Sequence, residues 1–152
     1  MRRLRGKVYA HNGTVYRSKL EVSVAEQLED AGVKFDYEQY KLSYSLNIRN
    51  AECCSCGGDA VVQFHEYLPD FWIKGTDIVI EAKGRFTAAD RKKILAVTET
   101  NPLVEVRMLF QIDQKLSKGR KKRYSDWCDD NDIRYSIGTI PEEWLHEFLE
   151  EQ

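Results

Sequence analysis

The sequence predicts a single α/β domain of the α+β type, in which a small, mostly antiparallel mixed sheet is flanked by helices. Two segments with helical periodicity lie at residues 18–31 and 87–100. Segments with strand-like alternation or continuous apolar character lie at residues 34–46, 60–65, 68–74, 77–83 and 104–112. At 152 residues, the chain is long enough for one domain with a substantial core.

The N-terminal part is predicted to consist of an arm followed by a helix. Residues 1–17 form the basic arm, with some strand character at 7–9. The first helix is expected over 18–31, because apolar residues recur there at helical spacing. Gly32 follows as the residue that ends this helix, since glycine readily adopts the left-handed conformation.

A β-hairpin is predicted where Asp70 and Glu81 occur. A two-residue turn at 75–76, Gly-Thr, would pair Lys74 with Asp77. In that register Asp70 lies opposite Glu81, because both pairs of residue numbers sum to 151. Directly opposed residues have Cβ atoms about 4.5–5.5 Å apart.

This arrangement has a chemical consequence for the two acids. Carboxylates held so close repel each other unless a proton or a cation lies between them. Oxygen ligands of this kind suit Mg²⁺. Lys83 follows Glu81 by two residues and projects from the same strand face. The pattern favours a divalent-metal site beside a phosphate; a salt bridge of Lys83 on a solvated sheet face is the alternative.

The second half of the chain is predicted to alternate between helices and strands. A helix over 87–100 ends at Asn101-Pro102, and the buried strand 104–112 follows. That strand would place Val106, Met108, Phe110 and Ile112 on one face. Short helices are expected at 125–131 and 142–150, the second introduced by Pro141.

Glu21 has two interpretations. Ser18 and Glu21 have the spacing of a capping box, in which the glutamate reaches back to the Ser18 amide. A carboxylate in the first turn of this helix could also lean over the hairpin and complete a metal site. The two roles do not exclude each other, although one side chain cannot fully satisfy both.

Charge is distributed unevenly along a chain whose net charge is −2. The first 20 residues contain six cations and no acid, and a second basic run spans 115–123. Such clusters either are solvated arms or allow a polyanion to bind. No apolar run is long enough for a membrane span, and no secretory signal follows the basic N-terminus. Four cysteines crowded mostly into one loop indicate reduced thiols and a cytoplasmic protein.

The order of several short motifs resembles the phage endonuclease I family, the Holliday-junction resolvases of the T-odd phages within the PD-(D/E)xK nuclease superfamily. The acid–acid–lysine core alone is a weak signal, but the resemblance runs in order through nearly the whole chain. The matching blocks are residues 16–21, 32–38, 68–71, 80–84, 90–93, 106–110, 127–128 and 140–144.

The resemblance implies a restriction-endonuclease-like fold, a single nuclease domain over 1–152, and an intertwined homodimer. Asp70 and Glu81 match the metal-binding acids, Glu21 matches the helix glutamate that completes the metal site, and Lys83 matches the lysine that orients or activates water. It further implies Mg²⁺, for which Mn²⁺ can substitute, and paired nicks in branched DNA. The place of action would be the host-cell cytoplasm.

The segment 48–65 departs from the family pattern as a cysteine-containing insertion. Cys53, Cys56 and His65 provide three ligands of the kind that zinc prefers, and Cys54, Cys128 or a partner chain would have to provide the fourth. The alternative is a loop of reduced thiols without metal. Because the insertion falls where the family's dimer bridge would run, the geometry of domain exchange is left open.

Candidate DNA contacts flank the acid–lysine motif: Arg17, Lys19, Arg85, Arg91, Lys92 and Lys93. The cluster 120–123 is expected to reach the duplex arms. The favoured hypothesis is a Mg²⁺-dependent nuclease that resolves branched DNA. Two alternatives are a mismatch-directed, nicking or restriction-like nuclease of the same fold, and a non-catalytic DNA-binding module.

Overall fold

A computed structural model describes residues 7–48 and 61–152. Nine strands and four helices lie within these residues. In chain order the elements are β1 (Tyr9–His11), β2 (Thr14–Tyr16), α1 (Lys19–Asp30), β3 (Phe35–Tyr37), β4 (Leu42–Ile48), β5 (Val61–Tyr67), β6 (Phe71–Ile73), β7 (Ile78–Lys83), α2 (Ala88–Thr100), β8 (Glu105–Phe110), α3 (Tyr124–Asp130), β9 (Tyr135–Ile137) and α4 (Glu142–Glu151). None of these helices is long and apolar enough to cross a membrane.

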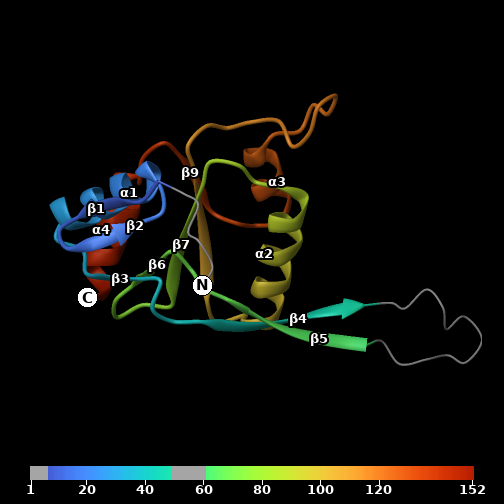
Figure 1. The fold of residues 1–152 in the computed structure, drawn as a ribbon, viewed down its shortest axis with the longest axis horizontal. Coiled ribbons are helices and arrows are strands. Elements are labelled where there is room, and N and C mark those ends of the chain that lie inside the picture. The colour runs from blue at the N-terminus through green and yellow to red at the C-terminus, as the bar shows by residue number, and fades with distance from the viewer. Residues whose placement is uncertain (1–6, 49–60) are drawn as a thin grey trace, which may run out of the picture.

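A five-stranded sheet in the order β3-β6-β7-β8-β9 forms the centre of the fold. Helices α1 and α4 cover one face and α2 and α3 the other, so the domain has three layers (Figure 1). The predicted α+β class with a mixed sheet is confirmed, but the expectation of a mostly antiparallel sheet is wrong. Strands β7, β8 and β9 run parallel to one another, because α2 and α3 act as crossover connections.

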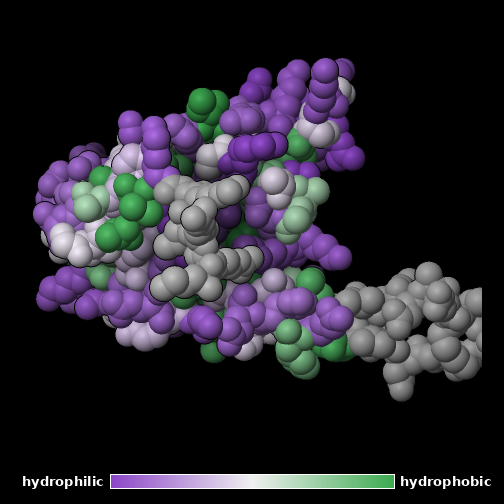
Figure 2. Space-filling model, in the orientation of Figure 1, coloured by the Kyte–Doolittle hydropathy of each residue, from purple (hydrophilic) through white to green (hydrophobic). Residues whose placement is uncertain are grey.

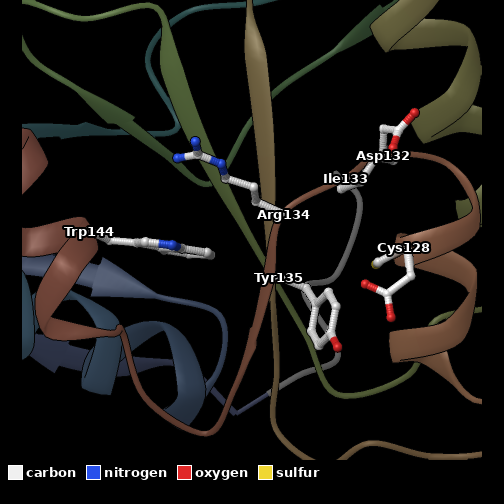
Figure 3. A pocket seen from close by; sticks show the side chains of 7 residues that line it. Cys128, Asp132, Ile133, Arg134, Tyr135 and Trp144 are labelled. Atoms are coloured by element: carbon white, nitrogen blue, oxygen red, sulfur yellow. The ribbon is translucent and has the colours of Figure 1, made fainter.

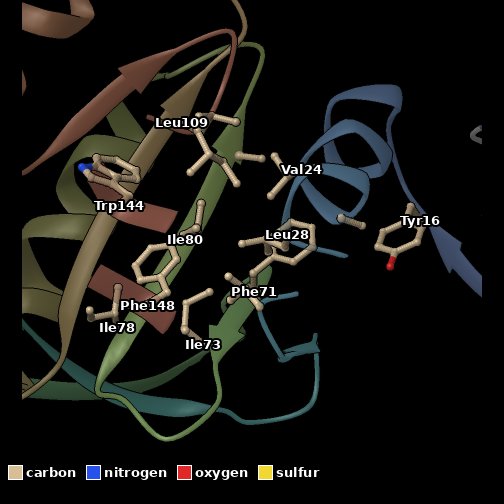
Figure 4. Packing of buried hydrophobic residues seen from close by; sticks show 14 residues of the cluster. Tyr16, Val24, Leu28, Phe71, Ile73, Ile78, Ile80, Leu109, Trp144 and Phe148 are labelled. Carbon is tan, nitrogen blue, oxygen red and sulfur yellow. The ribbon is translucent and has the colours of Figure 1, made fainter. Parts of the chain in front are cut away.

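Each face of the sheet has its own hydrophobic core. On the α1–α4 face, Leu28 and Phe148 pack over Phe71 and Ile80 (Figure 4). On the other face, Ile94 and Val97 of α2 pack with three residues of β8, which are Val106, Met108 and Phe110. These three share a face as predicted, whereas Ile112 lies beyond the strand and is 59% exposed.

The predicted hairpin register is confirmed. Phe71 pairs with Ile80 and Trp72 with Val79, so both pairs sum to 151. The turn is longer than predicted, however, because the Thr76 amide donates to the Ile73 carbonyl instead of closing a two-residue loop. Extending the ladder by one residue places Asp70 beside Glu81.

The first helix begins and ends as predicted. Ser18 caps α1 by accepting the Glu21 amide at 3.1 Å. At the other end Gly32 has a φ of +77°, and the Val33 amide donates to the Leu28 carbonyl. This pattern of a left-handed glycine and a backward hydrogen bond terminates a helix.

The predicted N-terminal arm contains an additional hairpin. Strands β1 and β2 pair around Asn12 and Gly13, both of which have positive φ. Asn-Gly is a strong signal for a two-residue hairpin turn, so the sequence did carry this information. His11 and Asn12 both hydrogen bond to Glu29 of α1 at 2.8 Å, which fixes the hairpin to the helix.

Strands β4 and β5 form a separate two-stranded ribbon that extends from the body of the domain (Figure 1). The predicted segment 34–46 divides into β3 of the central sheet and β4 of the ribbon, and β5 corresponds to the predicted segment 60–65. Both ribbon strands end two residues later than predicted, and they pair from Leu42 with Tyr67 to Ile48 with Val61. The base of the ribbon is attached to α2, where the Ser45 amide donates to the Thr100 hydroxyl at 3.1 Å.

Candidate active site

Asp70 and Glu81 lie together because β6 and β7 are neighbours in the predicted register. Asp70 is only 9% exposed and Glu81 only 3% exposed. The Ala82 amide donates to Asp70 Oδ2 at 2.9 Å, which holds that carboxylate against β7. The two acids therefore form a buried carboxylate pair at the end of the hairpin.

Burial and the nearby Glu81 charge raise the pKa of the Asp70 carboxyl well above its ordinary range. The Ala82 hydrogen bond and Lys83 act in the opposite direction but do not cancel this effect. The site thus favours either a proton on Asp70 or a cation beside the pair.

Lys83 is positioned next to the pair, as the alternation of β7 predicts. Its Nζ lies 3.3 Å from Glu81 Oε1 and 3.7 Å from Asp90 Oδ1. Burial lowers the pKa of Lys83, but the Glu81 and Asp90 charges outweigh it, so the net shift is upward. Lys83 is consequently a cation at neutral pH.

Tyr67 is a component of the site that sequence reasoning missed. Its hydroxyl donates to Glu81 Oε2 at 2.5 Å, and the residue is almost fully buried. Burial and the charges of Glu81 and Asp70 raise the pKa of the Tyr67 phenol well above its ordinary value. The only sequence signal is its position three residues before Asp70. The contact between Tyr67 and Glu81 joins β5 of the ribbon to β7 of the central sheet, and local sequence does not predict how these two elements pack.

Glu21 takes part in an extended capping arrangement. Its Oε2 accepts from the Arg17 amide at 3.1 Å and from the Tyr37 hydroxyl at 2.5 Å, while Oε1 accepts from the Ser18 hydroxyl. The predicted bond to the Ser18 amide is therefore wrong, since the amide one residue earlier takes its place. The charge of Glu21 is also one of the smaller causes that raise the pKa of Asp70.

Glu38 also borders the site, although it was not predicted to do so. It has a φ of +47°, which is unusual for a residue other than glycine. Its amide donates to the Asp70 carbonyl at 3.0 Å, and its carboxylate lies 3.0 Å from Arg17 Nε. Burial raises the pKa of Glu38, with further contributions from the Glu21 and Glu81 charges. The family blocks include this residue, but nothing local predicted its role.

The predicted metal site can be compared with this geometry. Within residues 7–48 and 61–152, no three His, Cys, Asp or Glu side chains are grouped so that they could hold a metal ion. Mg²⁺, however, often takes only one or two protein carboxylates and keeps several waters. Asp70 and Glu81 match that smaller donor set, and their mutual repulsion would be relieved by a cation. The participation of Glu21 as a third ligand stays a prediction.

The predicted zinc site falls mainly outside the described residues, because Cys53, Cys54 and Cys56 lie in the segment 49–60. His65 is exposed on β5, where its ring stacks on Tyr44 at a centroid distance of 5.5 Å. Cys128, the other candidate ligand among the described residues, is buried in the core on the α2–α3 face of the sheet, and burial raises the pKa of its thiol to about 12. Zinc binding itself stays a prediction.

The predicted DNA-contacting cations have different environments. Four of them, Arg17, Lys19, Arg85 and Lys92, are exposed, and Arg17 is also paired with Glu38. Arg91 instead donates to the Phe86 carbonyl at 2.7 Å, so it has an internal role. Lys93 lies over the Tyr67 ring, with Nζ 5.3 Å from its centre.

A separate pocket of about 490 Å³ lies between α3, β9 and α4 (Figure 3). Its lining includes Asp132, Arg134 and Trp144 and contains none of the predicted catalytic or DNA-contacting residues. The acid pair, with Lys83, therefore remains the candidate active site.

Comparisons with known proteins identify the family of the chain. A family model described as "Phage endonuclease I" matches residues 3–152. The chain is 35% identical over 133 residues to "Endonuclease I" of Escherichia phage T7, covering 87% of this chain and 79% of that protein. It is also 35% identical over 130 residues to "Endodeoxyribonuclease 1" of Enterobacteria phage T3, covering 85% of this chain and 76% of that protein. The predicted resemblance is thus confirmed: the chain belongs to the phage endonuclease I family.

Proposed function

We propose that this endonuclease resolves four-way junctions and other branched DNA by Mg²⁺-dependent hydrolysis, making paired nicks as a homodimer in the host-cell cytoplasm. The observation that supports the chemistry most directly is the buried pair Asp70 and Glu81 with Lys83 beside it. A DNA substrate is supported by the names of the relatives, which are an endonuclease and an endodeoxyribonuclease of phages.

Each residue has a distinct task in the proposed reaction. Asp70 and Glu81 would hold Mg²⁺, and Glu21 would complete the site. The chemistry that Mg²⁺ supplies when bound is activation of water and neutralisation of charge at the phosphate. Lys83, held as a cation by its acidic neighbours, would stabilise the negative charge that develops at phosphorus.

The dimer would use the β4–β5 ribbon. An isolated two-stranded ribbon is marginally stable in water, so it needs a covering surface. Phe64 and Val62 of β5 are 77% and 45% exposed, and hydrophobic surface is visible along the ribbon (Figure 2). A second copy of the chain is the covering surface that family membership favours.

A cleavage assay tests the proposal. A synthetic four-way junction and a linear duplex of matched sequence are incubated with the protein in Mg²⁺ or in EDTA. We expect symmetric, Mg²⁺-dependent cuts near the branch point. Preferential cutting of the linear duplex would instead indicate a nicking or restriction-like nuclease, and tight binding without cleavage would indicate a DNA-binding module.

The substitution Glu81→Gln tests the role of the carboxylate pair. Glutamine keeps the shape of the side chain and an oxygen that can accept from Tyr67, but it removes the charge that a metal requires. We expect cleavage to fall to the level seen in EDTA while junction binding, measured by gel shift, stays unchanged. Glu99→Gln on the exposed part of α2 is the control and should cut normally. Loss of both binding and cleavage in Glu81→Gln would argue against a metal-ligand role.

A further inference from the structure

We propose that Tyr67 is a positioning residue of the cleavage site: its hydroxyl fixes the Glu81 carboxylate, and the face of its ring holds the Lys93 ammonium group. The proposal rests on the proposed function for its substrate. It goes beyond that function by assigning a role to a residue outside the acid–lysine motif.

The first contact orients Glu81. The Tyr67 hydroxyl donates to Oε2 at 2.5 Å, while Lys83 Nζ lies 3.3 Å from Oε1. Each carboxylate oxygen therefore faces a different partner, and rotation of the carboxylate about its terminal bond would break one or both contacts. Groups that orient a metal ligand in this way commonly change metal affinity when they are removed.

Tyr67 is well suited to hold a fixed orientation. It is the last residue of β5, is paired with Leu42 of β4, and is only 2% exposed. Its ring packs in the core on the α2 face of the sheet. A tyrosine with so little freedom can hold its hydrogen-bond partner at a defined position, because the ring cannot follow a movement of the carboxylate.

The second contact lies on the face of the ring. Lys93 Nζ is 5.3 Å from the ring centre, within the range of a cation–π interaction. The side chain comes from the second turn of α2 and is half-buried, so it is directed toward the sheet. One aromatic ring thus joins a carboxylate suited to a metal and an ammonium group suited to a phosphate.

In this arrangement Tyr67 fixes the position of the Glu81 carboxylate relative to the Lys93 ammonium group. A scissile phosphate bound next to Glu81 would lie within reach of a cation held on the Tyr67 ring. Lys93 would therefore contribute to substrate binding, whereas the Tyr67 hydroxyl would contribute to the metal-binding geometry. The two contributions come from different atoms of Tyr67 and can be separated experimentally.

The substitution Tyr67→Phe isolates the hydroxyl, because it keeps the ring and its interaction with Lys93. We expect affinity for Mn²⁺, measured by electron paramagnetic resonance without DNA, to fall about tenfold or more. The turnover rate on a four-way junction should fall similarly, while junction affinity in EDTA stays unchanged. The control is Tyr124→Phe, a buried tyrosine whose hydroxyl accepts the Phe86 amide away from the acids.

The substitution Lys93→Met isolates the ammonium group, because methionine keeps an apolar stem over the ring. We expect junction affinity to fall severalfold while Mn²⁺ affinity stays at the wild-type value. Wild-type Mn²⁺ affinity in Tyr67→Phe would overturn the proposal. An equal loss of Mn²⁺ affinity in Tyr124→Phe would also overturn it, because the effect would then be a general one on the core.

These measurements also separate this proposal from the proposed function. Mn²⁺ binding needs no DNA, so Tyr67→Phe can be compared with the wild type even if the wild type does not cut junctions. A wild-type protein that binds Mn²⁺ but prefers linear duplex would contradict only the proposed substrate. A wild-type protein that binds no Mn²⁺ would contradict both proposals.

Discussion

Asp70 illustrates the energetic cost of the active site at the scale of one residue. Its carboxyl is buried and lies beside the charge of Glu81, and both effects raise its pKa. A group of this kind is less stable as a charged carboxylate in the folded protein than in the unfolded chain. The metal-free protein therefore becomes less stable as the pH rises from the ordinary pKa of an aspartate through the raised pKa of the folded state.

The substitution Asp70→Asn tests this reasoning. Asparagine keeps an oxygen for the Ala82 amide but carries no charge. In EDTA at pH 8 we expect a higher free energy of unfolding, by about 1.4 kcal/mol for each unit by which the Asp70 pKa is raised. The gain should shrink as the pH falls and vanish below the ordinary aspartate pKa of 3.8, where the wild-type carboxyl is protonated in both states. Urea unfolding at several pH values measures it.

A control for that experiment is available in the same hairpin. Asp77 lies at the exposed turn, away from the carboxylate pair, so Asp77→Asn should change stability little at either pH. A pH-independent gain in Asp70→Asn would contradict the explanation based on charge.

The backbone of Glu38 also has a conformation that costs free energy. A left-handed conformation outside glycine costs free energy, and such residues concentrate at functional sites. Here the conformation lets the Glu38 amide reach the Asp70 carbonyl and the carboxylate reach Arg17. The strained residue thus connects β3 to the strand that carries the acid.

Among the elements, α4 is attached to the sheet by a buried charge. Arg107 of β8 is fully buried between the Trp144 and Phe148 rings, at 5.1 and 5.3 Å from their centres. Its guanidinium also bonds Glu105 at 2.9 Å and Glu147 at 2.7 Å. The helix is therefore held by aromatic stacking and by charge-assisted hydrogen bonds at the same residue.

The substitution Arg107→Ala should lower the free energy of unfolding by about 3 kcal/mol or more, because it breaks a buried ion-pair network and leaves a cavity between the rings. Urea unfolding provides the measurement. Arg134 bonds the same two glutamates but is 57% exposed, so Arg134→Ala should cost less than about 1 kcal/mol. Equal losses in the two variants would show that burial is not the decisive difference.

The elements also differ in how far local sequence predicted them. Helices α1 and α2 were predicted nearly to the residue, because apolar spacing and capping residues are local signals. Strand β9 was not predicted, since its three residues, Tyr135 to Ile137, form a strand only by pairing with β8. The hairpin at Asn12-Gly13 could have been predicted from its turn residues.

At the scale of the whole molecule, a net charge of −2 coexists with local basic surfaces. The loop between β8 and α3 rises from the body of the domain (Figure 1) and carries the exposed run 115–123. Lys122 is paired with Asp130, and Arg123 donates to the Asp113 carbonyl. The remaining cations of this run are suited to contact DNA phosphates.

Replacing Lys118, Arg120 and Lys121 with glutamine should lower the affinity for a four-way junction and make that affinity less dependent on salt concentration. The slope of log K against log salt should become shallower by about 0.9 for each DNA phosphate that these side chains no longer neutralise. Fluorescence anisotropy in EDTA at several salt concentrations measures this slope. The same change at Lys34, Lys41 and Lys74, which are exposed cations near β3, is the control. An equal effect of the two triple substitutions would indicate nonspecific attraction.

The sequence by itself determined the main helices, the hairpin register that opposes Asp70 and Glu81, and the family. These depend on spacing, turn residues and motif order, which act over short stretches of chain. Only the tertiary structure decided that Tyr67 would bond Glu81 and that Tyr37 would bond Glu21. Periodicity assigns a residue to one face of a helix or strand. Which side chains contact one another on that face depends on how separate elements pack, and the candidate active site consists of such contacts.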